Sequence, residues 1–170
     1  MLFIIIRGPA SVGKSTISKI IARKIGALHI SFDDILSKNN LDIIKRKGIS
    51  AESFVKSNEI ALDMIKQQNL KIIVLDGCFY QDEQMNHFIK NFIGKHYIFT
   101  LKAKLEDCIT RNKERDNPMT EKAIRDVYKL VSKKDYGKII DTTGKKINQV
   151  AQETLNYLTI KTFPQKTSKK

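Results

Sequence analysis

The chain has 170 residues and a net charge of +13, and 41% of its residues are hydrophobic and 29% charged. These values are typical of one soluble globular domain. The longest apolar runs, residues 2–6 and 72–75, are too short to cross a membrane, and no basic segment precedes the first, as a signal peptide would require. Two cysteines, Cys78 and Cys108, do not make a disulfide framework, so we expect a cytoplasmic protein.

The positive charge has two explanations. Residues 161–170 contain four lysines and no acid, so the rest of the chain still carries +9. Such a field favours polyanionic partners, including nucleotides, RNA and DNA. A solvated, lysine-rich surface explains the same numbers, since isoleucine, lysine and asparagine are frequent throughout the sequence.

Apolar segments alternate with amphipathic ones along the chain, which predicts a mostly parallel sheet covered by helices on both faces. Strands are expected over residues 2–7, 27–31, 71–76, 95–101 and 138–140. Helices are expected over residues 14–25, 33–38, 51–65, 85–92, 105–112, 121–131 and 147–158. Gly26 is the stop signal of the first helix, and Ser50 and Thr120 are the caps of the third and sixth. In the fourth helix, Met85, Phe88, Ile89 and Phe92 lie on one side. We expect one domain over residues 1–160 and a disordered tail over residues 161–170.

A phosphate-binding loop follows the first strand. The segment Gly8, Pro9, Ala10, Ser11, Val12, Gly13, Lys14, Ser15 fits the pattern G-x-x-x-x-G-K-[ST], and Thr16 follows it. The glycines permit a tight turn whose N–H groups point at phosphate oxygens, and the next helix adds its positive N-terminal end. Lys14 is expected to reach the β- and γ-phosphates of ATP, and the Ser15 hydroxyl to ligate Mg²⁺.

Two carboxylates follow the second strand. Asp33 and Asp34 lie at the carboxyl edge of the predicted sheet, where ligands bind in open α/β folds. A kinase that phosphorylates a hydroxyl benefits from a carboxylate that orients the hydroxyl and accepts its proton, whereas an acceptor phosphate needs no such base. Either acid is a candidate base and substrate contact. Capping of the short helix by Asp33 explains its position equally well.

A third carboxylate, Asp76, ends the apolar strand over residues 71–76, which is the Walker B pattern. It could hold a water molecule on Mg²⁺ or contact the acceptor, although an Asp-Gly turn is an alternative. Tyr80 follows and could stack on an acceptor base, while packing is its other role. The histidines His29, His87 and His96 have no metal-ligand spacing among themselves, and we interpret them as structural or surface residues.

A predicted lid contains two arginines. Arg111 and Arg115 are four residues apart where a helix ends in a polar loop, and their forked donors match the oxygens of a transferring phosphoryl group. Solvated charge at a helix C-terminus is the alternative. Thr143, in the loop after the fifth strand, could border the adenine of ATP, although a turn explains that segment as well.

These motifs, in this order, resemble the small P-loop kinases. The Asp33-Asp34 pair, the Arg111-Asn112-x-x-Arg115 lid and residues 119–131 are similar to the polynucleotide-kinase-like (AAA_33-like) family, and residues 76–80 and the lid also resemble the O-phosphoseryl-tRNA kinases. The resemblance covers roughly residues 1–158. It implies a three-layer α/β P-loop kinase fold with a five-stranded, mostly parallel sheet and a small lid. It also implies ATP and Mg²⁺, with Asp33 as the base, Lys14 and the loop amides as the phosphate cradle, and Arg111 and Arg115 as lid arginines.

Three functions stay open at this point. A kinase that phosphorylates a hydroxyl, on a nucleic acid end, a nucleoside or a small metabolite, agrees best with the acidic pair and the basic charge. A nucleoside-monophosphate kinase would need cations for the acceptor phosphate, which Lys45, Arg46 and Lys47 could supply. A nucleotide-dependent switch or RNA-binding protein would need a residue that orients water, and the sequence offers no clear candidate.

Overall fold

The computed structural model describes residues 1–45 and 48–158. Its main sheet has five strands, β1 (Leu2–Arg7), β2 (Leu28–Ser31), β5 (Ile72–Gly77), β6 (Lys95–Lys102) and β7 (Lys138–Asp141), in the order β2-β5-β1-β6-β7. Every pairing is parallel, and β1 is central, with Ile5 opposite Leu75 on one side and Ile98 on the other. The predicted five-stranded α/β fold is therefore confirmed, and each expected strand is present.

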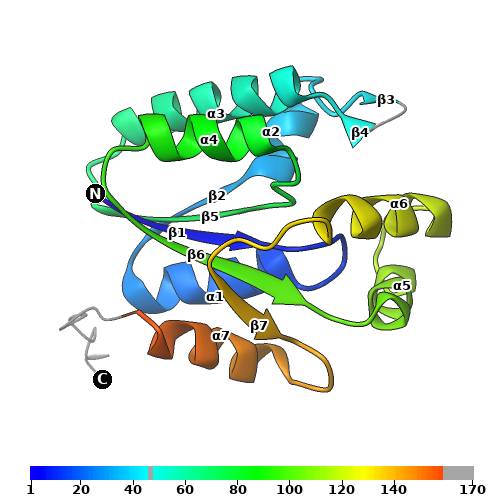
Figure 1. Cartoon of the computed structure of the whole chain (residues 1–170). Helices are drawn as coiled ribbons and strands as arrows, with labels where there is room; N and C mark the ends of the chain where they lie inside the picture. The colour runs from blue at the N-terminus through cyan, green and yellow to red at the C-terminus, as the bar shows by residue number, and fades with distance from the viewer. Residues whose placement is uncertain (46–47, 159–170) are drawn as a thin grey trace.

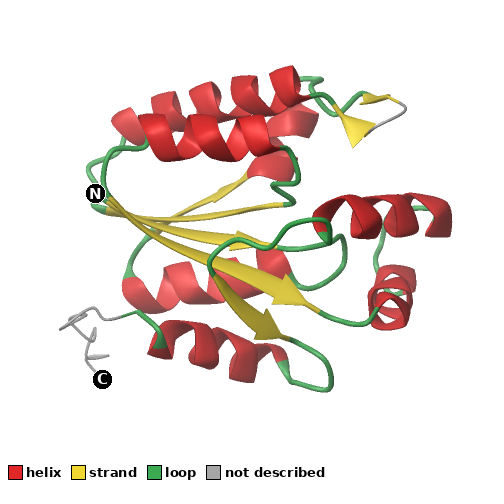
Figure 2. Cartoon of the chain, in the orientation of Figure 1, coloured by secondary structure: helices red, strands yellow, loops and turns green. Residues whose placement is uncertain are grey.

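Helices cover both faces of the sheet (Figures 1 and 2). One face carries α1 (Lys14–Ile25) and α7 (Ile147–Asn156), and the other carries α2 (Phe32–Lys38), α3 (Ala51–Lys66) and α4 (Asp82–Asn91). Two helices, α5 (Leu105–Lys113) and α6 (Glu121–Val131), lie beyond the carboxyl ends of the strands, at the end of the molecule opposite the N-terminus (Figure 1). This three-layer arrangement leaves the carboxyl edge of the sheet available for a site.

The predicted helix caps Ser50 and Thr120 and the stop signal Gly26 are confirmed. The hydroxyls of Ser50 and Thr120 accept the N–H groups of Ser53 and Ala123 at the starts of α3 and α6. Gly26 ends α1 in the left-handed conformation, at φ 66°. Helix α2 differs from expectation, because its cap is Ser31, whose hydroxyl accepts the N–H of Asp34. Helix capping therefore does not explain why an acid occupies position 33.

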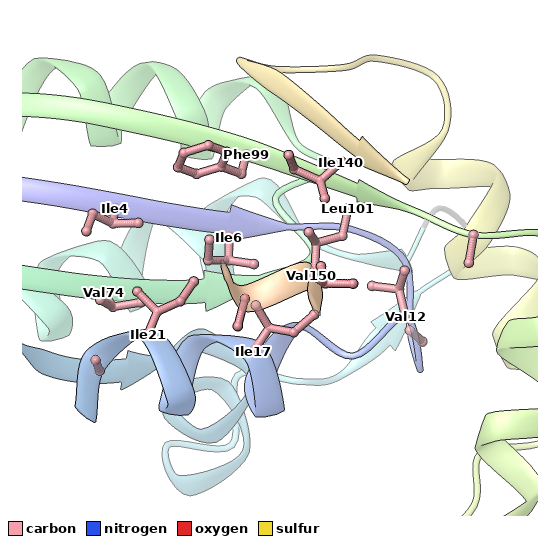
Figure 3. Packing of buried hydrophobic residues seen from close by; sticks show 14 of the residues in the cluster. Ile4, Ile6, Val12, Ile17, Ile21, Val74, Phe99, Leu101, Ile140 and Val150 are labelled. Atoms are coloured by element: carbon pink, nitrogen blue, oxygen red, sulfur yellow. The ribbon is translucent and has the colours of Figure 1, made fainter. Parts of the chain in front are cut away.

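The two sides of the sheet have different cores. The side under α1 and α7 is mainly aliphatic, and Figure 3 shows Ile4 and Ile6 of the central strand packed with Ile17, Ile21 and Val150. The side under α3 and α4 is rich in aromatic rings, and it contains Phe3, Phe32, Phe79, Phe88 and Phe92. Ile89 does not join this core, contrary to expectation, and is 49% exposed. The buried stripe runs through Met85 and Phe88 of α4 to Phe92 just after it, and Ile89 lies to one side of this stripe.

A short antiparallel pair was not predicted. It consists of β3 (Ile44–Lys45) and β4 (Gly48–Ile49), and these residues are too few for a periodic pattern to identify. Residues 46 and 47, the side chain of Lys45 and residues 159–170 lie outside the described part of the chain. The predicted phosphate contacts of Lys45, Arg46 and Lys47, the domain boundary at residue 160 and the disordered tail therefore stay predictions.

Candidate active site

A cleft of about 1330 Å³ lies at the carboxyl ends of the strands. The phosphate-binding loop, the start of α2, the segment after β5 and helices α5 and α6 all contribute to its walls. Of the predicted site residues, the following line it: Ala10, Ser11, Gly13, Lys14, Ser15, Thr16, Asp33, Tyr80, Arg111 and Arg115. Gly8, Val12, Asp34, Asp76 and Thr143 do not appear on its surface. The structure thus brings most of the predicted site together.

The loop between β1 and α1 leaves a helix terminus open toward the cleft. Gly13 precedes α1 at φ 103°, and no side chain caps this helix, in contrast to α2, α3 and α6. The first N–H groups of α1 are therefore free to bind an anion. Gly8 has a packing role instead, because a Cβ there would lie 2.7 Å from the carbonyl oxygen of Leu101. Both glycines are required by geometry, as the motif predicts.

Lys14 is buried at the base of the cleft. Its Nζ donates to the carbonyl oxygen of Pro9 at 2.9 Å and to the Cys78 sulfur at 3.8 Å. Burial acts to lower the pKa of Lys14, but Cys78 and the carboxylates of Asp33 and Asp76 act against it, and the resulting pKa is raised. Burial raises the pKa of Cys78 to about 11, so its thiol is neutral at pH 7. Lys14 is thus a fixed positive charge.

Ser15, Asp76 and His29 form a hydrogen-bonded row in which Asp76 is the middle residue. Its Oδ1 accepts the Ser15 hydroxyl at 2.7 Å, and its Oδ2 lies 2.5 Å from Nε2 of His29. The Asp76 side chain is 0% exposed and that of His29 is 18% exposed. Sequence reasoning missed His29, because the contact joins β2 to β5, whose pairing only the folded sheet reveals.

The oxygens of Ser15 and Asp76 fit a magnesium ion. Both are hard donors and lie side by side where the loop meets α1. Ser15 lines the cleft, whereas Asp76 is buried directly behind it and would hold the ion through Ser15 or a water molecule. In residues 1–45 and 48–158 no group of three or more His, Cys, Asp and Glu side chains could hold a metal. Mg²⁺ commonly uses one or two protein ligands and takes its others from water and substrate phosphates.

The structure distinguishes between the two acids of the predicted pair. Asp33 lines the cleft, whereas Asp34 is exposed on α2 and does not line it. The Asp33 carboxyl is reached by solvent, yet protein surrounds much of it within the cleft. This partial desolvation raises its pKa, and the positive charge of Lys14 acts in the opposite direction. Of the two aspartates, Asp33 is therefore the one that lies where a general base would have to be.

The two lid arginines differ in their surroundings. Arg111 donates to the Thr142 hydroxyl at 3.1 Å, to the Thr142 carbonyl oxygen at 3.2 Å and to the Val12 carbonyl oxygen at 3.4 Å. The guanidinium of Arg115 is exposed in the cleft and has no hydrogen-bond partner among the described residues. Arg111 thus joins the lid to the loop after β7. Thr143 lies in a turn in which its N–H donates to Asp141, and its place beside the adenine stays a prediction.

Asn112 connects the lid to the phosphate-binding loop, a contact that the sequence did not predict. Its Nδ2 donates to the Met119 carbonyl oxygen at 2.7 Å. Its Oδ1 accepts the Met119 N–H at 3.1 Å and lies 3.4 Å from the Ser11 hydroxyl. Asn112 is 4% exposed, so these bonds fix where α5 ends and where the polypeptide turns toward α6.

Tyr80 lines the cleft beside Gly48 and Ile49. Its hydroxyl accepts the N–H of Ile49 at 2.7 Å, and its ring packs edge-on against Phe54 at 5.0 Å. Gly48 lies so close that an added Cβ would be 2.7 Å from the Tyr80 hydroxyl and 3.0 Å from Leu130 of α6. Tyr80 is thus a packing residue that also faces the cleft.

Helix α6 presents basic side chains to the cleft. Lys122 and Lys129 on the helix and Lys133 just after it line the cleft, with Asp126 between them. The segment after α6 is attached to the end of β1 by Arg7, a buried residue whose guanidinium donates to the carbonyl oxygens of Val131 and Lys134. These bonds connect the C-terminal end of α6 to the strand that leads into the phosphate-binding loop.

The fold and the loop define a protein of the P-loop kinase class. A gluconokinase from Sinorhizobium meliloti 1021 has this fold, with a TM-score of 0.71 and 13% identity over 90% of this chain and 89% of that one. A family model described as an AAA domain matches residues 4–141, and the chain belongs to that family. This match does not identify the narrower polynucleotide-kinase-like family, so that resemblance stays a prediction.

Two curated relatives are similar in sequence. An adenylate kinase from Mesomycoplasma hyopneumoniae (strain 232) is 32% identical over 117 residues, which are 64% of this chain and 55% of the relative. A putative adenylate kinase from Thermococcus kodakarensis is 27% identical over 92% of this chain and 85% of the relative. The chain thus covers little more than half of the first relative and most of the second. In the described residues no helix is long and apolar enough to span a membrane.

Proposed function

We propose that this protein is an ATP-dependent phosphotransferase that transfers the γ-phosphoryl group to a hydroxyl acceptor. The observation that carries the proposal is the Asp33 carboxyl, which lines the same cleft as the buried ammonium of Lys14. A base and a phosphate-binding cation in one cleft are what a hydroxyl kinase requires. The kinase relatives and the shared fold support the phosphotransferase class.

The proposed step moves one proton and one phosphoryl group. The acceptor hydroxyl donates a hydrogen bond to Asp33, its oxygen attacks the γ-phosphorus, the bond to the β-phosphate oxygen breaks, and the proton passes to Asp33. ADP leaves with the electrons of the broken bond. The raised pKa of Asp33 makes it a stronger base than an ordinary aspartate, and the Lys14 charge opposes the rise and so favours the ionised form.

The remaining predicted residues have supporting roles. Lys14 and the uncapped N–H groups of α1 would bind the β- and γ-phosphates, and Arg115 would stabilise the charge of the transferring group. Arg111 would hold the lid to the loop after β7, which is the loop expected to border the nucleotide base. Ser15 and Asp76 would hold Mg²⁺, which, when bound, neutralises phosphate charge during transfer.

The finer proposal, that the acceptor is the hydroxyl end of a nucleic acid, follows the polynucleotide-kinase-like resemblance. The row of Lys122, Lys129 and Lys133 along the cleft supports it, because a strand that enters there would bring its phosphates beside these ammonium groups. Affinity for an oligonucleotide should then fall steeply between 50 and 200 mM salt, by roughly tenfold or more for a few phosphate contacts. Affinity that does not change with salt would contradict the proposed strand contact.

A nucleoside-monophosphate kinase is the second candidate, and the adenylate kinase relatives favour it. Its acceptor phosphate would need cations on the wall formed by α2, β4 and α3. The described residues of that wall that line the cleft are Asp33, Leu36, Asp42, Ile44, Gly48, Ile49 and Phe54, and none is basic. The side chains of Lys45, Arg46 and Lys47, which could supply these cations, lie outside the described part of the chain. We rank the hydroxyl acceptor first because the Asp33 carboxyl lines the same cleft as Lys14. We place a nucleotide-dependent switch third, since the sequence offers no clear candidate for a residue that would orient a water.

A phosphate-transfer screen tests the proposal. Labelled ATP and Mg²⁺ would be incubated with the protein and with 5′-hydroxyl RNA and DNA oligomers, nucleosides, nucleoside monophosphates or a metabolite pool. Label on a hydroxyl is the expected result. Label on monophosphates alone would favour the second candidate, and bound ATP without any labelled acceptor would favour the switch.

A matched pair of substitutions tests the role of Asp33. Asp33→Ala should lower turnover by about 10²–10⁴, the usual contribution of a general base, and leave ATP affinity nearly unchanged. Asp34→Ala, on the same helix but outside the cleft, is the control and should retain turnover. Equal activity of the two variants would disprove the assignment of Asp33 as the base.

A further inference from the structure

His29, Asp76 and Ser15 form a row that connects three elements of the fold. His29 is on β2, Asp76 is at the end of β5, and Ser15 is in the first turn of α1. In the parallel pairing of β2 with β5, His29 is opposite Val74, so Asp76 is its diagonal neighbour on the same face of the sheet. The distances in the row are 2.5 Å from His29 Nε2 to Oδ2 and 2.7 Å from the Ser15 hydroxyl to Oδ1.

The direction of these bonds follows from their chemistry. An ionised carboxylate only accepts hydrogen bonds, so the Ser15 hydroxyl donates to Oδ1 and the ring Nε2 carries the proton that it donates to Oδ2. Asp76 is fully buried, and a buried carboxylate is costly without donors on its oxygens. These two donors therefore fix the rotation of the Asp76 carboxylate and direct Oδ1 at Ser15.

We propose that His29 is a positioning residue for the magnesium site, which it controls through Asp76. The inference rests on the proposed function only in that Ser15 and Asp76 are taken as the groups that would hold Mg²⁺. Oδ2 is held by the histidine, so Oδ1 stays beside the Ser15 hydroxyl at the point where the loop meets α1. Partners that orient ligands in this way typically contribute 10–100-fold to metal affinity.

A purely structural role makes a different prediction. If the His29 hydrogen bond only joined β2 to β5, its loss would lower the melting temperature and leave the magnesium dependence of nucleotide binding unchanged. If His29 positions Asp76, its loss weakens the contribution of Mg²⁺ to nucleotide binding, while binding without metal, through Lys14 and the loop amides, is retained. Binding measured with and without metal separates the two roles.

The experiment measures binding of a fluorescent ATP analogue to the full chain during a Mg²⁺ titration and again in EDTA. His29→Met removes the donor at similar volume, and His29→Gln retains an N–H near the Nε2 position. We expect His29→Met to raise the half-saturating Mg²⁺ concentration about 10–100-fold without a change in EDTA. His29→Gln should return it to within a few-fold of the original protein.

His96→Met is the matched control. His96 is also partly buried on a strand, and its Nε2 lies 2.7 Å from the backbone carbonyl oxygen of Phe92, among the rings of the aromatic core. This variant should lose some thermal stability and retain the original Mg²⁺ dependence. If His29→Met does not fold, His29→Asn replaces it, since its shorter amide does not reach Oδ2.

The results separate this inference from the proposed function. A changed Mg²⁺ requirement in His29→Met, rescued in His29→Gln, supports the inference even if no hydroxyl acceptor is ever labelled. An unchanged Mg²⁺ requirement in His29→Met overturns it, even if the protein phosphorylates hydroxyls. Equal changes in His29→Met and His29→Gln also overturn it, because the hydrogen-bond donor would then not be what matters.

Discussion

The side of the cleft proposed to bind the nucleotide and the side proposed to bind the acceptor are built differently. The nucleotide side comes mainly from consecutive residues, in which Gly13 opens the end of α1 and Lys14 and Ser15 follow directly. The acceptor side is assembled from the start of α2, the segment after β5, the β3–β4 pair and α6. A local motif can therefore identify the donor side, while the shape of the acceptor side depends on tertiary packing.

The largest expected effect is on the nucleotide side. Lys14→Ala should lower kcat/KM by about 10³–10⁵, if its charge contributes as much as an arginine that stabilises a transferring phosphoryl group. It should also weaken ATP binding, because the buried cation that faces the phosphates is lost. Calorimetric titration with ATP and a transfer assay measure the two effects. A variant that stays active would contradict the assignment of the loop.

On the acceptor side, Asp33 should determine how kcat/KM falls at acidic pH. Asp33 accepts a proton only when ionised, so kcat/KM should fall tenfold per pH unit below its pKa, which lies above the usual ~3.9 of an aspartate because of desolvation. In Asp33→Asn this pH dependence should disappear along with most of the activity. A raised pKa means that the folded state favours the protonated form, so ionised Asp33 opposes folding at neutral pH. The melting temperature of Asp33→Asn should therefore rise, and a fall would contradict the direction of the shift.

Substitutions of the two lid arginines should differ in their effect on stability. Arg115→Ala should lower kcat by about 10²–10³ with little change in stability, since no protein group among the described residues bonds to its guanidinium. Arg111→Ala should also destabilise the fold, by about 1–2 kcal/mol, because it loses its bonds to Thr142 and Val12. Denaturant unfolding and steady-state kinetics on both variants check this. Equal losses of stability would show that the two residues do not differ as described.

The smallest expected effect concerns the wall near Tyr80. Gly48→Ala should raise the KM for the acceptor by roughly tenfold, about 1.4 kcal/mol, and leave the KM for ATP unchanged, because its methyl group would meet the Tyr80 hydroxyl and Leu130. Gly144→Ala is the control. That glycine also has a positive φ, of 66°, but an added Cβ would have no neighbour within 4 Å. A similar change in both variants would mean that backbone strain, and not the wall, is responsible.

Several elements of the site could be predicted because their signals are local. The alternation of apolar and amphipathic segments located every strand of the main sheet, and the caps Ser50 and Thr120 located two helix starts. The β3–β4 pair was missed, since two residues in each strand are too few for periodicity. Ile89 was misplaced because its position relative to the core depends on how α4 packs against the sheet.

The sequence by itself determined the class of the protein, because a phosphate-binding loop requires particular residues at fixed spacing between a strand and a helix. The tertiary structure decided which acid of the pair lines the cleft, that His29 meets Asp76, and that Asn112 joins the lid to the loop. The contacts of His29 and Asn112 are between residues that are distant in the chain. Which acid lines the cleft depends on the direction in which α2 points its side chains. The pairing of β2 with β5 and the packing of α5 supply that information, and no spacing within one segment contains it.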